Sequence, residues 1–350
     1  MRVVIVGATG NIGISLVERL ARDRRVGNVV GVARRAPEGP LRFLGSERVS
    51  WVSADIRYDD LEPLVKDADV VVDLAWMFQP THRPEVTWST NVVGTSRLID
   101  AVRVTGVPAI VVSSSVAAYS PRGHTDPVDE SWPTHGTSTA AYAREKAYVE
   151  RMLDALETAQ ERPRVVRIRP AFVFQSRSAS EQHRIFAGPL VPRTLVRPKL
   201  IPVMPVPGGL LLQAVHASDV ADAFASAALS DVSGAFNICA DDVLGPTELS
   251  RLVQARRIPV PPALVRGLLN AAWTARAIPA DPKLFDAVMT LPVMSNARAK
   301  SELGWRPSNS AEDVLEEFLT GLRTGKGERT APLEPNSSEE RNAKVAGSRA

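Results

Sequence analysis

The first thirteen residues constrain the fold of this chain more than any other stretch. They read MRVVIVGATGNIG, so an apolar run from Val3 to Val6 is followed by Gly7, Gly10 and Gly13. A short apolar run that ends at a glycine is typical of a parallel strand buried on both faces. Apolar residues then recur at helical intervals. The sequence therefore predicts a strand, a glycine-rich turn and a helix in that order.

This glycine-rich turn predicts a site for an anionic ligand. Glycine lets the backbone turn tightly and approach a ligand closely, and the start of the next helix offers free N–H groups and a positive dipole end. A dinucleotide pyrophosphate fits such a site, while a purely structural turn is the alternative. The residues of the turn that we expect to contact the cofactor are Gly7, Thr9, Gly10, Asn11, Ile12 and Gly13.

Further strands alternate with helical stretches along the chain. The predicted strands cover residues 28–33, 49–53, 69–74, 109–112, 165–168, 213–216 and 235–238. This alternation predicts an α/β fold with a Rossmann-type doubly wound parallel sheet.

The remaining segments divide the chain further. We expect residues 1–175, with 211–240 returning to them, to form a dinucleotide-binding domain. Residues 176–210 and 241–323 would form a smaller, mostly helical substrate-binding part. Residues 324–350 are polar and nearly free of large apolar side chains, which predicts a disordered tail.

The end of the second strand bears on the choice of cofactor. An acidic residue there binds the ribose hydroxyls of NAD, whereas an arginine can pair with the 2′-phosphate of NADP. Here Ala33 is followed by Arg34 and Arg35. The sequence therefore favours NADP over NAD, and the alternative is that both arginines are solvated loop charges.

Composition argues against several other classes of protein. The 350 residues carry a formal net charge of only +3, with scattered arginines and no basic stripe, so we expect no nucleic-acid partner. The five histidines show no metal-ligand spacing, which predicts no metal site.

Neither a signal peptide nor a run of transmembrane length is apparent, so we expect a cytoplasmic protein. The stretch 264–273 fits a core or pocket helix better than a membrane-contacting one. A homodimer remains open.

Three residues form a chemically coherent set beyond the carboxyl ends of the strands, where parallel sheets bind ligands. Hydride transfer at a carbinol also moves a proton on its oxygen, which calls for a general acid or base. Tyr142 could serve if the cation of Lys146, one helical turn away, lowers a phenol pKa that is ordinarily about 10. Ser115 could bind the substrate oxygen. A chance pairing of tyrosine and lysine on a helix surface is the alternative.

Taken together, these motifs resemble the extended short-chain dehydrogenase/reductase superfamily, in its NAD-dependent epimerase/dehydratase branch. The resemblance covers roughly residues 1–320. Besides the glycine-rich turn and the Tyr-x-x-x-Lys pair, it rests on Asp55-Ile56, Leu74-Ala75-Trp76, Asn91 to Thr95, Asp129-Glu130, Arg169-Pro170, Val215 to Ala221 and Ala299 to Trp305.

The resemblance implies roles for individual residues. Ser115 would be the catalytic serine, Tyr142 the proton donor or acceptor, and Lys146 its activator and a ligand of the cofactor ribose. Further cofactor contacts would come from Asp55, Ile56, Leu74, Ala75, Asn91 and Pro170, and a helix-initiating role is the alternative for Asn91.

Two departures from the family pattern are informative. Trp76 stands where sugar-nucleotide enzymes more often carry a smaller residue, which predicts a bulkier and more apolar pocket. Val116 and Ala117 follow Ser115 where sugar dehydratases carry Asp-Glu, so dehydratase chemistry is disfavoured.

We therefore expect an NAD(P)-dependent oxidoreductase that acts on a small molecule at a carbinol or carbonyl carbon. A net reductase or dehydrogenase and a sugar-nucleotide 4-epimerase both remain open. A non-catalytic NADPH-binding redox sensor or assembly factor is the alternative, although such relatives usually lack an intact Tyr and Lys pair.

Overall fold

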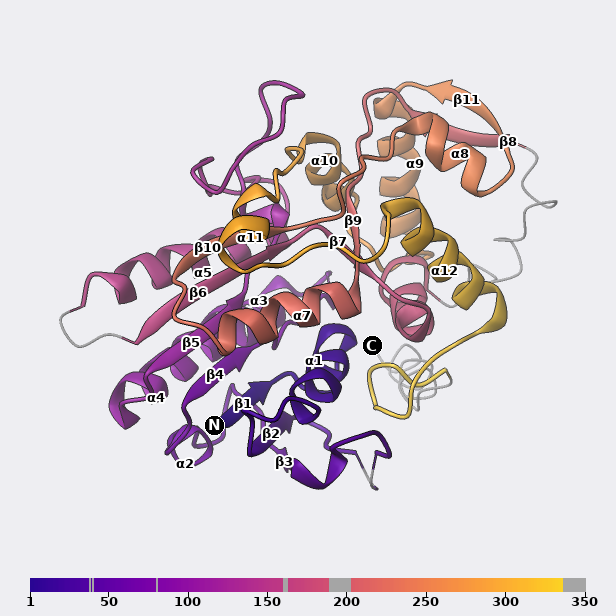
Figure 1. Cartoon of the computed structure of the whole chain (residues 1–350). Helices are drawn as coiled ribbons and strands as arrows, with labels where there is room; N and C mark the ends of the chain where they lie inside the picture. Colours follow the sequence, from indigo (N-terminus) through magenta and orange to yellow (C-terminus); the bar gives the residue numbers. More distant parts are fainter. Residues whose placement is uncertain (38, 40, 80, 160–162, 189–202, 336–350) are drawn as a thin grey trace.

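The computed structural model describes residues 1–335 except 38, 40, 80, 160–162 and 189–202 (Figure 1). Its centre is a parallel sheet of seven strands in the order β10-β6-β5-β4-β1-β2-β3. The strands are β1 (Arg2–Val6), β2 (Asn28–Ala33), β3 (Val49–Ser53), β4 (Val70–Asp73), β5 (Ala109–Ser113), β6 (Arg164–Pro170) and β10 (Gly234–Ile238). The chain winds outward on both sides of β1, which confirms the predicted doubly wound fold.

Successive residues of β1 serve opposite faces of the sheet, because side chains alternate along a strand. Val3 and Ile5 pack in a core with α1 (Asn11–Ala21) and α7 (Ala217–Ala228). Val4 and Val6 pack in a second core with α4 (Thr95–Thr105) and α5 (Ala141–Glu157). Figure 1 shows α1 and α7 side by side across one face of the sheet. The sheet is therefore covered on both faces.

The helical stretch between β4 and β5 is interrupted. It consists of α3 (Pro84–Trp88), a π-helical segment Ser89–Gly94 and then α4. The wider π turn contains Asn91, which is fully buried and bonded to the loop after β4. A π segment of this kind often marks a functional site.

Apart from α7 and β10, most residues beyond β6 form a smaller, mostly helical part. The helices are α6 (Ala179–Gln182), α8 (Pro246–Leu252), α9 (Pro262–Thr274), α10 (Pro282–Thr290), α11 (Ala297–Glu302) and α12 (Ala311–Thr324). Short parallel strand pairs join β7 (Phe172–Phe174) to β9 (Ala214–His216) and β8 (Val203–Pro207) to β11 (Arg256–Val260). The short elements are α2 (Glu62–Val65), the 3₁₀ turns Ser46–Arg48, Val116–Ala118 and Ser176–Ser178, and a π turn His183–Ala187. The domain boundaries given above stay a prediction.

The C-terminal segment differs from the sequence expectation. Residues 325–335, which we expected to belong to a disordered tail, pack against the body of the protein, and Leu333 is fully buried. The hydroxyl of Thr330 donates to the carbonyl of Thr9 in the glycine-rich turn at 2.8 Å. Residues 336–350 lie outside the described part. Within the described residues, we find no helix with both the length and the apolar character to span a membrane.

Candidate functional site

The three glycines of the N-terminal turn are required for different reasons. Gly7 has a φ of +84°, and a Cβ atom there would lie 2.7 Å from the carbonyl carbon of Leu74. A Cβ atom at Gly13 would collide with the carbonyl oxygen of Gly7. Gly10 has a φ of −80°, and a Cβ atom there would meet nothing nearer than 3.5 Å. The fold itself thus needs Gly7 and Gly13, whereas the open backbone at Gly10 fits the approach of a pyrophosphate.

Residues next to Gly10 connect the turn to other parts of the chain. Thr9 is buried, and Ile12 is half-buried against the core. The side chain of Asn11 donates to the carbonyl of Val173 at 3.1 Å, and Gln175 donates to the Asn11 side-chain oxygen at 2.8 Å. Contacts within the protein therefore hold the turn without a ligand. The helix α1 begins at Asn11 with no side chain capping its first N–H groups.

The corner after β2 contains both arginines from which the sequence favoured NADP. Arg34 and Arg35 are exposed at the end of the strand. Asp55 is ion-paired to Arg57 at 2.7 Å, and this pair together with the charge of Arg34 lowers the pKa of Asp55. Ile56 is buried below the sheet edge. This corner is consequently not the purely cationic one that the sequence indicated.

The ends of β4 and β6 place three of the predicted cofactor residues. The amide of Leu74 donates to the carbonyl of Val6 at 2.8 Å, and that of Ala75 donates to the carboxylate of Asp73 at 3.0 Å. Pro170 is buried at the end of β6 and is paired in register with β10. Asp73 is buried too, and burial raises its pKa to about 6.

Asn91 holds the loop after β4 against α5. Its amide donates to the carbonyl of Met77 at 2.8 Å and to Glu145 at 2.7 Å, and its oxygen accepts from the amide of Met77 at 2.7 Å. Thr87 donates to the other oxygen of Glu145 at 2.7 Å. The side chain of Asn91 is thus bonded to the chain on all sides, so the structure gives it a positioning role.

The structure brings Ser115, Tyr142 and Lys146 together where β5 faces α5. The hydroxyl of Ser115 accepts from the amide of Ala117 at 3.1 Å, and the ammonium of Lys146 donates to the carbonyl of Ser113 at 2.7 Å. Burial raises the pKa of Tyr142 to about 12, and a hydrogen bond with Ser115 acts in the opposite direction. At neutral pH the phenol is therefore protonated.

Aromatic side chains surround Tyr142 and reach Lys146. The ring of Phe78 stacks on Tyr142 with centroids 4.9 Å apart, and Trp76 meets Tyr142 edge to face at 5.6 Å. The ammonium of Lys146 lies 3.3 Å from the centroid of the Trp76 ring. Burial lowers the pKa of Lys146 to about 7, although Asp73 acts to raise it. The expected lowering of the Tyr142 pKa by Lys146 is not part of this arrangement, because the groups that shift it are the surrounding protein, Ser115 and Glu145.

A narrow pocket opens beside Tyr142. The residues that line it are Met77, Phe78, Thr81, Pro84, Thr87, Ala140, Ala141, Tyr142, Glu145, Asp281 and Leu284. Apolar and aromatic side chains dominate, and the two charged ones, Glu145 and Asp281, are both acidic. No basic side chain lines it among the described residues.

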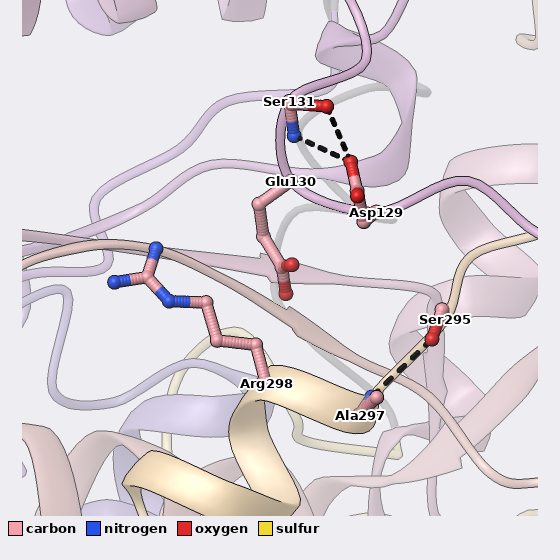
Figure 2. Close-up of a pocket in the computed structure, with 6 residues that line it drawn as sticks. All are labelled: Asp129, Glu130, Ser131, Ser295, Ala297 and Arg298. Atoms are coloured by element: carbon pink, nitrogen blue, oxygen red, sulfur yellow. Dashed lines mark hydrogen bonds between the residues drawn. The ribbon is translucent and has the colours of Figure 1, made fainter.

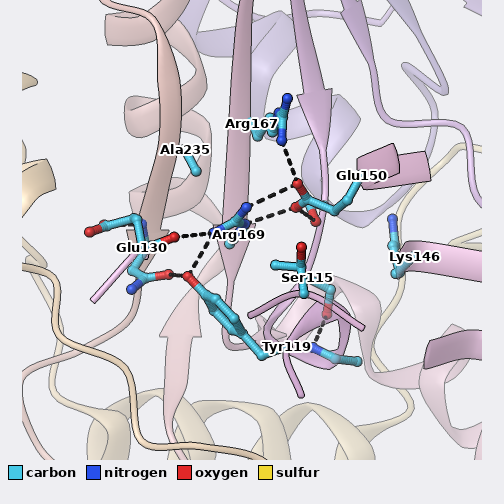
Figure 3. A network of polar contacts seen from close by, with 12 residues as sticks. Ser115, Tyr119, Glu130, Lys146, Glu150, Arg167, Arg169 and Ala235 are labelled. Carbon is cyan, nitrogen blue, oxygen red and sulfur yellow. Dashed lines mark hydrogen bonds and ion pairs between the residues drawn. The ribbon is translucent and has the colours of Figure 1, made fainter. Parts of the chain in front are cut away.

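A buried ionic network lies directly behind the serines, and sequence reasoning missed it. Figure 3 shows Glu150 at its centre, between Arg167 and Arg169. Arg169 donates to the two oxygens of Glu150 at 2.8 and 2.9 Å, Arg167 donates at 3.0 Å, and the Ser114 hydroxyl donates at 2.6 Å. Arg169 also reaches the hydroxyl of Tyr119 at 2.9 Å. Arg167 and Arg169, at alternate positions of a strand that is buried from Val165 to Pro170, were the available signal, since buried cations need anionic partners.

A second, wider hollow of about 370 Å³ lies apart from these residues (Figure 2). It is lined by Asp129, Glu130, Ser131, Ser295, Ala297 and Arg298. Its polar groups already have partners, since Asp129 accepts from Ser131 at 2.9 Å and Arg298 donates to the carbonyl of Ala235 at 2.9 Å. The pocket beside Tyr142 is therefore the candidate site.

Several known proteins are similar to this chain over most of its length. An uncharacterized protein of Mycobacterium tuberculosis (strain ATCC 25618 / H37Rv) is 26% identical over 330 residues, 91% of this chain and 83% of that protein. A 3-diazoavenalumate denitrifying reductase of Streptomyces sp is 26% identical over 88% of this chain and 97% of its own length. The fold is similar to MoeE5 in complex with UDP-glucuronic acid and NAD, with a TM-score of 0.67, 21% identity and coverage of 93% and 99% of the two chains.

The prediction that NADP is favoured over NAD is wrong. MoeE5 was solved with NAD in both its UDP-glucuronic acid and its UDP-glucose complexes. The sequence argument considered Arg34 and Arg35 alone, whereas the corner after β2 also contains the carboxylate of Asp55, which is ion-paired to Arg57 and interacts with Arg34. A 2′-phosphate would meet a carboxylate there as well as the arginines.

The family assignment rests on a match to most of the chain. The family model of the NAD dependent epimerase/dehydratase family matches residues 3–239 of this chain. This match covers the sheet, the glycine-rich turn, Ser115, Tyr142 and Lys146, and it confirms the expectation of an enzyme. The chain belongs to the NAD dependent epimerase/dehydratase family.

Proposed function

We propose that this chain is an NAD-dependent reductase or dehydrogenase that acts on a carbonyl or carbinol carbon of a small, largely apolar molecule. The observation that carries the proposal is the lining of the pocket beside Tyr142, where Phe78, Met77 and Leu284 meet the acidic Glu145 and Asp281. A sugar nucleotide brings a diphosphate, which proteins bind with arginine, lysine or helix N-termini. Two carboxylates and apolar walls disfavour that group and suit an uncharged substrate.

Two residues would act on the substrate oxygen, and Lys146 would bind the ribose of the cofactor, as the family resemblance implies. NAD, when bound, supplies or accepts the hydride, and the turn around Gly10 with the start of α1 would hold its pyrophosphate. Ser115 would bind the substrate oxygen, and Tyr142 would exchange a proton with that same oxygen. With a pKa of about 12, the phenol of Tyr142 is protonated at neutral pH, so it would be the proton donor when the reaction runs in the direction of reduction. The similarity to a protein named as a reductase supports this direction.

A 4-epimerase that acts on sugar nucleotides is the second candidate. Its support is the similarity of the fold to MoeE5, which was solved with UDP-glucuronic acid and with UDP-glucose. An epimerase oxidises and then reduces the same carbon, so its cofactor is not consumed. Net oxidation of NADH therefore separates the two candidates.

The test combines substrates with two variants. The purified protein would be assayed for NADH oxidation with a panel of aromatic and aliphatic aldehydes and ketones, and for epimer formation with UDP-glucose. Tyr142→Phe should lower turnover by at least about 100-fold while it leaves NAD affinity within about twofold, because only the ionisable oxygen is lost. Gly10→Val should abolish NAD binding in a folded protein, because the added side chain occupies the open backbone.

Either of two results would contradict the proposal. Epimerisation of UDP-glucose without net NADH oxidation would favour the second candidate. Full turnover by Tyr142→Phe on a validated carbonyl substrate would remove this tyrosine from the mechanism.

A further inference from the structure

Trp76 lies directly over the ammonium of Lys146. The nitrogen is 3.3 Å from the ring centroid, well inside the distance at which a cation and an aromatic face attract each other. The same indole meets the ring of Tyr142 edge to face at 5.6 Å. Trp76 therefore contacts both Tyr142, to which we assign the proton exchange, and Lys146, which would bind the cofactor ribose.

Apolar packing against the second core and contacts with neighbouring rings hold this indole. Its N–H group is buried and has no hydrogen-bond partner among the described residues. Buried donors without partners are rare and unfavourable, because the group has lost its hydration and gained nothing in exchange. The indole is thus the least satisfied group of the site.

The backbone on either side of Trp76 is fixed. The amide of Ala75 donates to Asp73, and Met77 is bonded through both its amide and its carbonyl to Asn91. A movement of the indole away from Lys146 is therefore a rotation of the side chain, with no displacement of the loop.

We propose that Trp76 is a cap that competes with the ribose of the cofactor for Lys146. One donor of the ammonium is used by the carbonyl of Ser113, and the face covered by the indole cannot bind a ribose hydroxyl at the same time. Cofactor binding then requires the indole to rotate off the ammonium, and the contact that is lost lowers the apparent affinity for NAD. The proposal rests on the NAD site of the proposed function.

The experiment measures NAD affinity in a graded series at position 76. Trp76→Ala removes the cap and should bind NAD about tenfold tighter, the share of affinity that a desolvated cation–π contact can withhold. Trp76→Phe keeps a weaker ring and should fall between Trp76→Ala and the wild type. Trp88→Phe is the matched control, because Trp88 is partly exposed and packs against Tyr148, and its NAD affinity should equal that of the wild type.

A second readout follows the indole itself. Titration with NAD should change the tryptophan fluorescence of the wild type and of Trp88→Phe, and most of that change should be lost in Trp76→Phe. Equal or weaker NAD binding by a folded Trp76→Ala protein, or an undiminished fluorescence change in Trp76→Phe, would overturn the cap.

These readouts are independent of turnover. If no carbonyl substrate is reduced but the affinities follow the expected series, the proposed reaction fails and the cap stands. If carbonyl substrates are reduced and the series is flat, the reaction stands and the cap fails.

Discussion

Lys146 and Glu150 lie one turn apart on α5 and are both buried, yet their charges are compensated in opposite ways. Burial disfavours the carboxylate of Glu150, but Arg169 and the hydroxyl of Ser114 more than offset it, and the pKa falls to about 2. Burial likewise disfavours the ammonium of Lys146, and the nearby carboxylates offset it only in part, so that its pKa falls to about 7.

The comparison contrasts a charge that stabilises the folded protein with one whose hydrogen-bonding capacity is only partly used. Each oxygen of Glu150 accepts two hydrogen bonds, so no further partner is needed. Lys146 has a carbonyl and an indole, and no ion pair among the described residues. A perturbed titratable group beside a pocket is a typical feature of a functional site, because part of its interaction energy is reserved for the bound molecule.

Removal of the paired charge should have the largest effect. Glu150→Met leaves Arg169 and Arg167 buried without their central carboxylate, and we expect the free energy of unfolding to fall by about 3–5 kcal/mol. Urea denaturation measures this change. The control is the double variant Glu150→Met with Arg169→Met, which removes both charges and should recover part of the loss. A loss below about 1 kcal/mol in the single variant would show that the network is not a structural support.

A methionine at position 146, one turn earlier on α5, should raise the free energy of unfolding instead of lowering it. Lys146→Met replaces a poorly compensated ammonium, and we expect a gain of about 1–2 kcal/mol in the free energy of unfolding at pH 7, with loss of turnover. The folded-state pKa, about 7, lies below the ordinary 10.5, so the unfolded chain binds the extra proton between these values. Wild-type stability therefore rises with pH across this window, and Lys146→Met lacks that rise.

Denaturation at pH 7 and pH 9 checks the sign. The advantage of Lys146→Met over the wild type should shrink by about 2 kcal/mol from the lower to the higher pH, since one proton per molecule is released across this range. A constant difference would mean that Lys146 has an ordinary pKa and is not the uncompensated charge described above.

The smallest expected effect concerns the hydrogen bond from the hydroxyl of Ser114 to the carboxylate of Glu150. Ser114→Ala deletes the hydrogen bond to Glu150 and leaves both arginine contacts in place, so we expect a loss of about 1–2 kcal/mol. Ser114→Thr keeps a hydroxyl and serves as the control. A stability equal to the wild type in Ser114→Ala would show that Glu150 is fully compensated by the arginines alone.

Local patterns were enough to predict most of the sheet. Strands 28–33 and 49–53 were predicted with the bounds that the structure has. The first is a buried, mostly apolar run, as expected of a parallel strand covered on both faces, whereas the second lies at the edge of the sheet and is only partly buried. β11 was missed, since Arg256 and Pro259 are unfavourable for a strand and only pairing with β8 accounts for it.

The site was predictable in its residue types but not in its contacts. Spacing alone placed Tyr142 and Lys146 on one helical face, whereas the indole between them depends on a side-chain rotamer that no sequence pattern encodes. The network of Glu150 depends on two strands and a helix that meet only in the folded chain.

The contact between Thr330 and Thr9 ties the far end of the described chain to its first turn, across 321 positions of sequence. Arg177 reinforces it, since it pairs with Glu18 of α1 at 2.8 Å and with Glu328 at 3.2 Å. Two events that share one structural element are thermodynamically linked, and the linkage is reciprocal. Occupancy of the glycine-rich turn and docking of residues 325–335 therefore influence each other equally. A protein shortened to Thr324 for convenience of expression would lack these contacts and be altered at its glycine-rich turn.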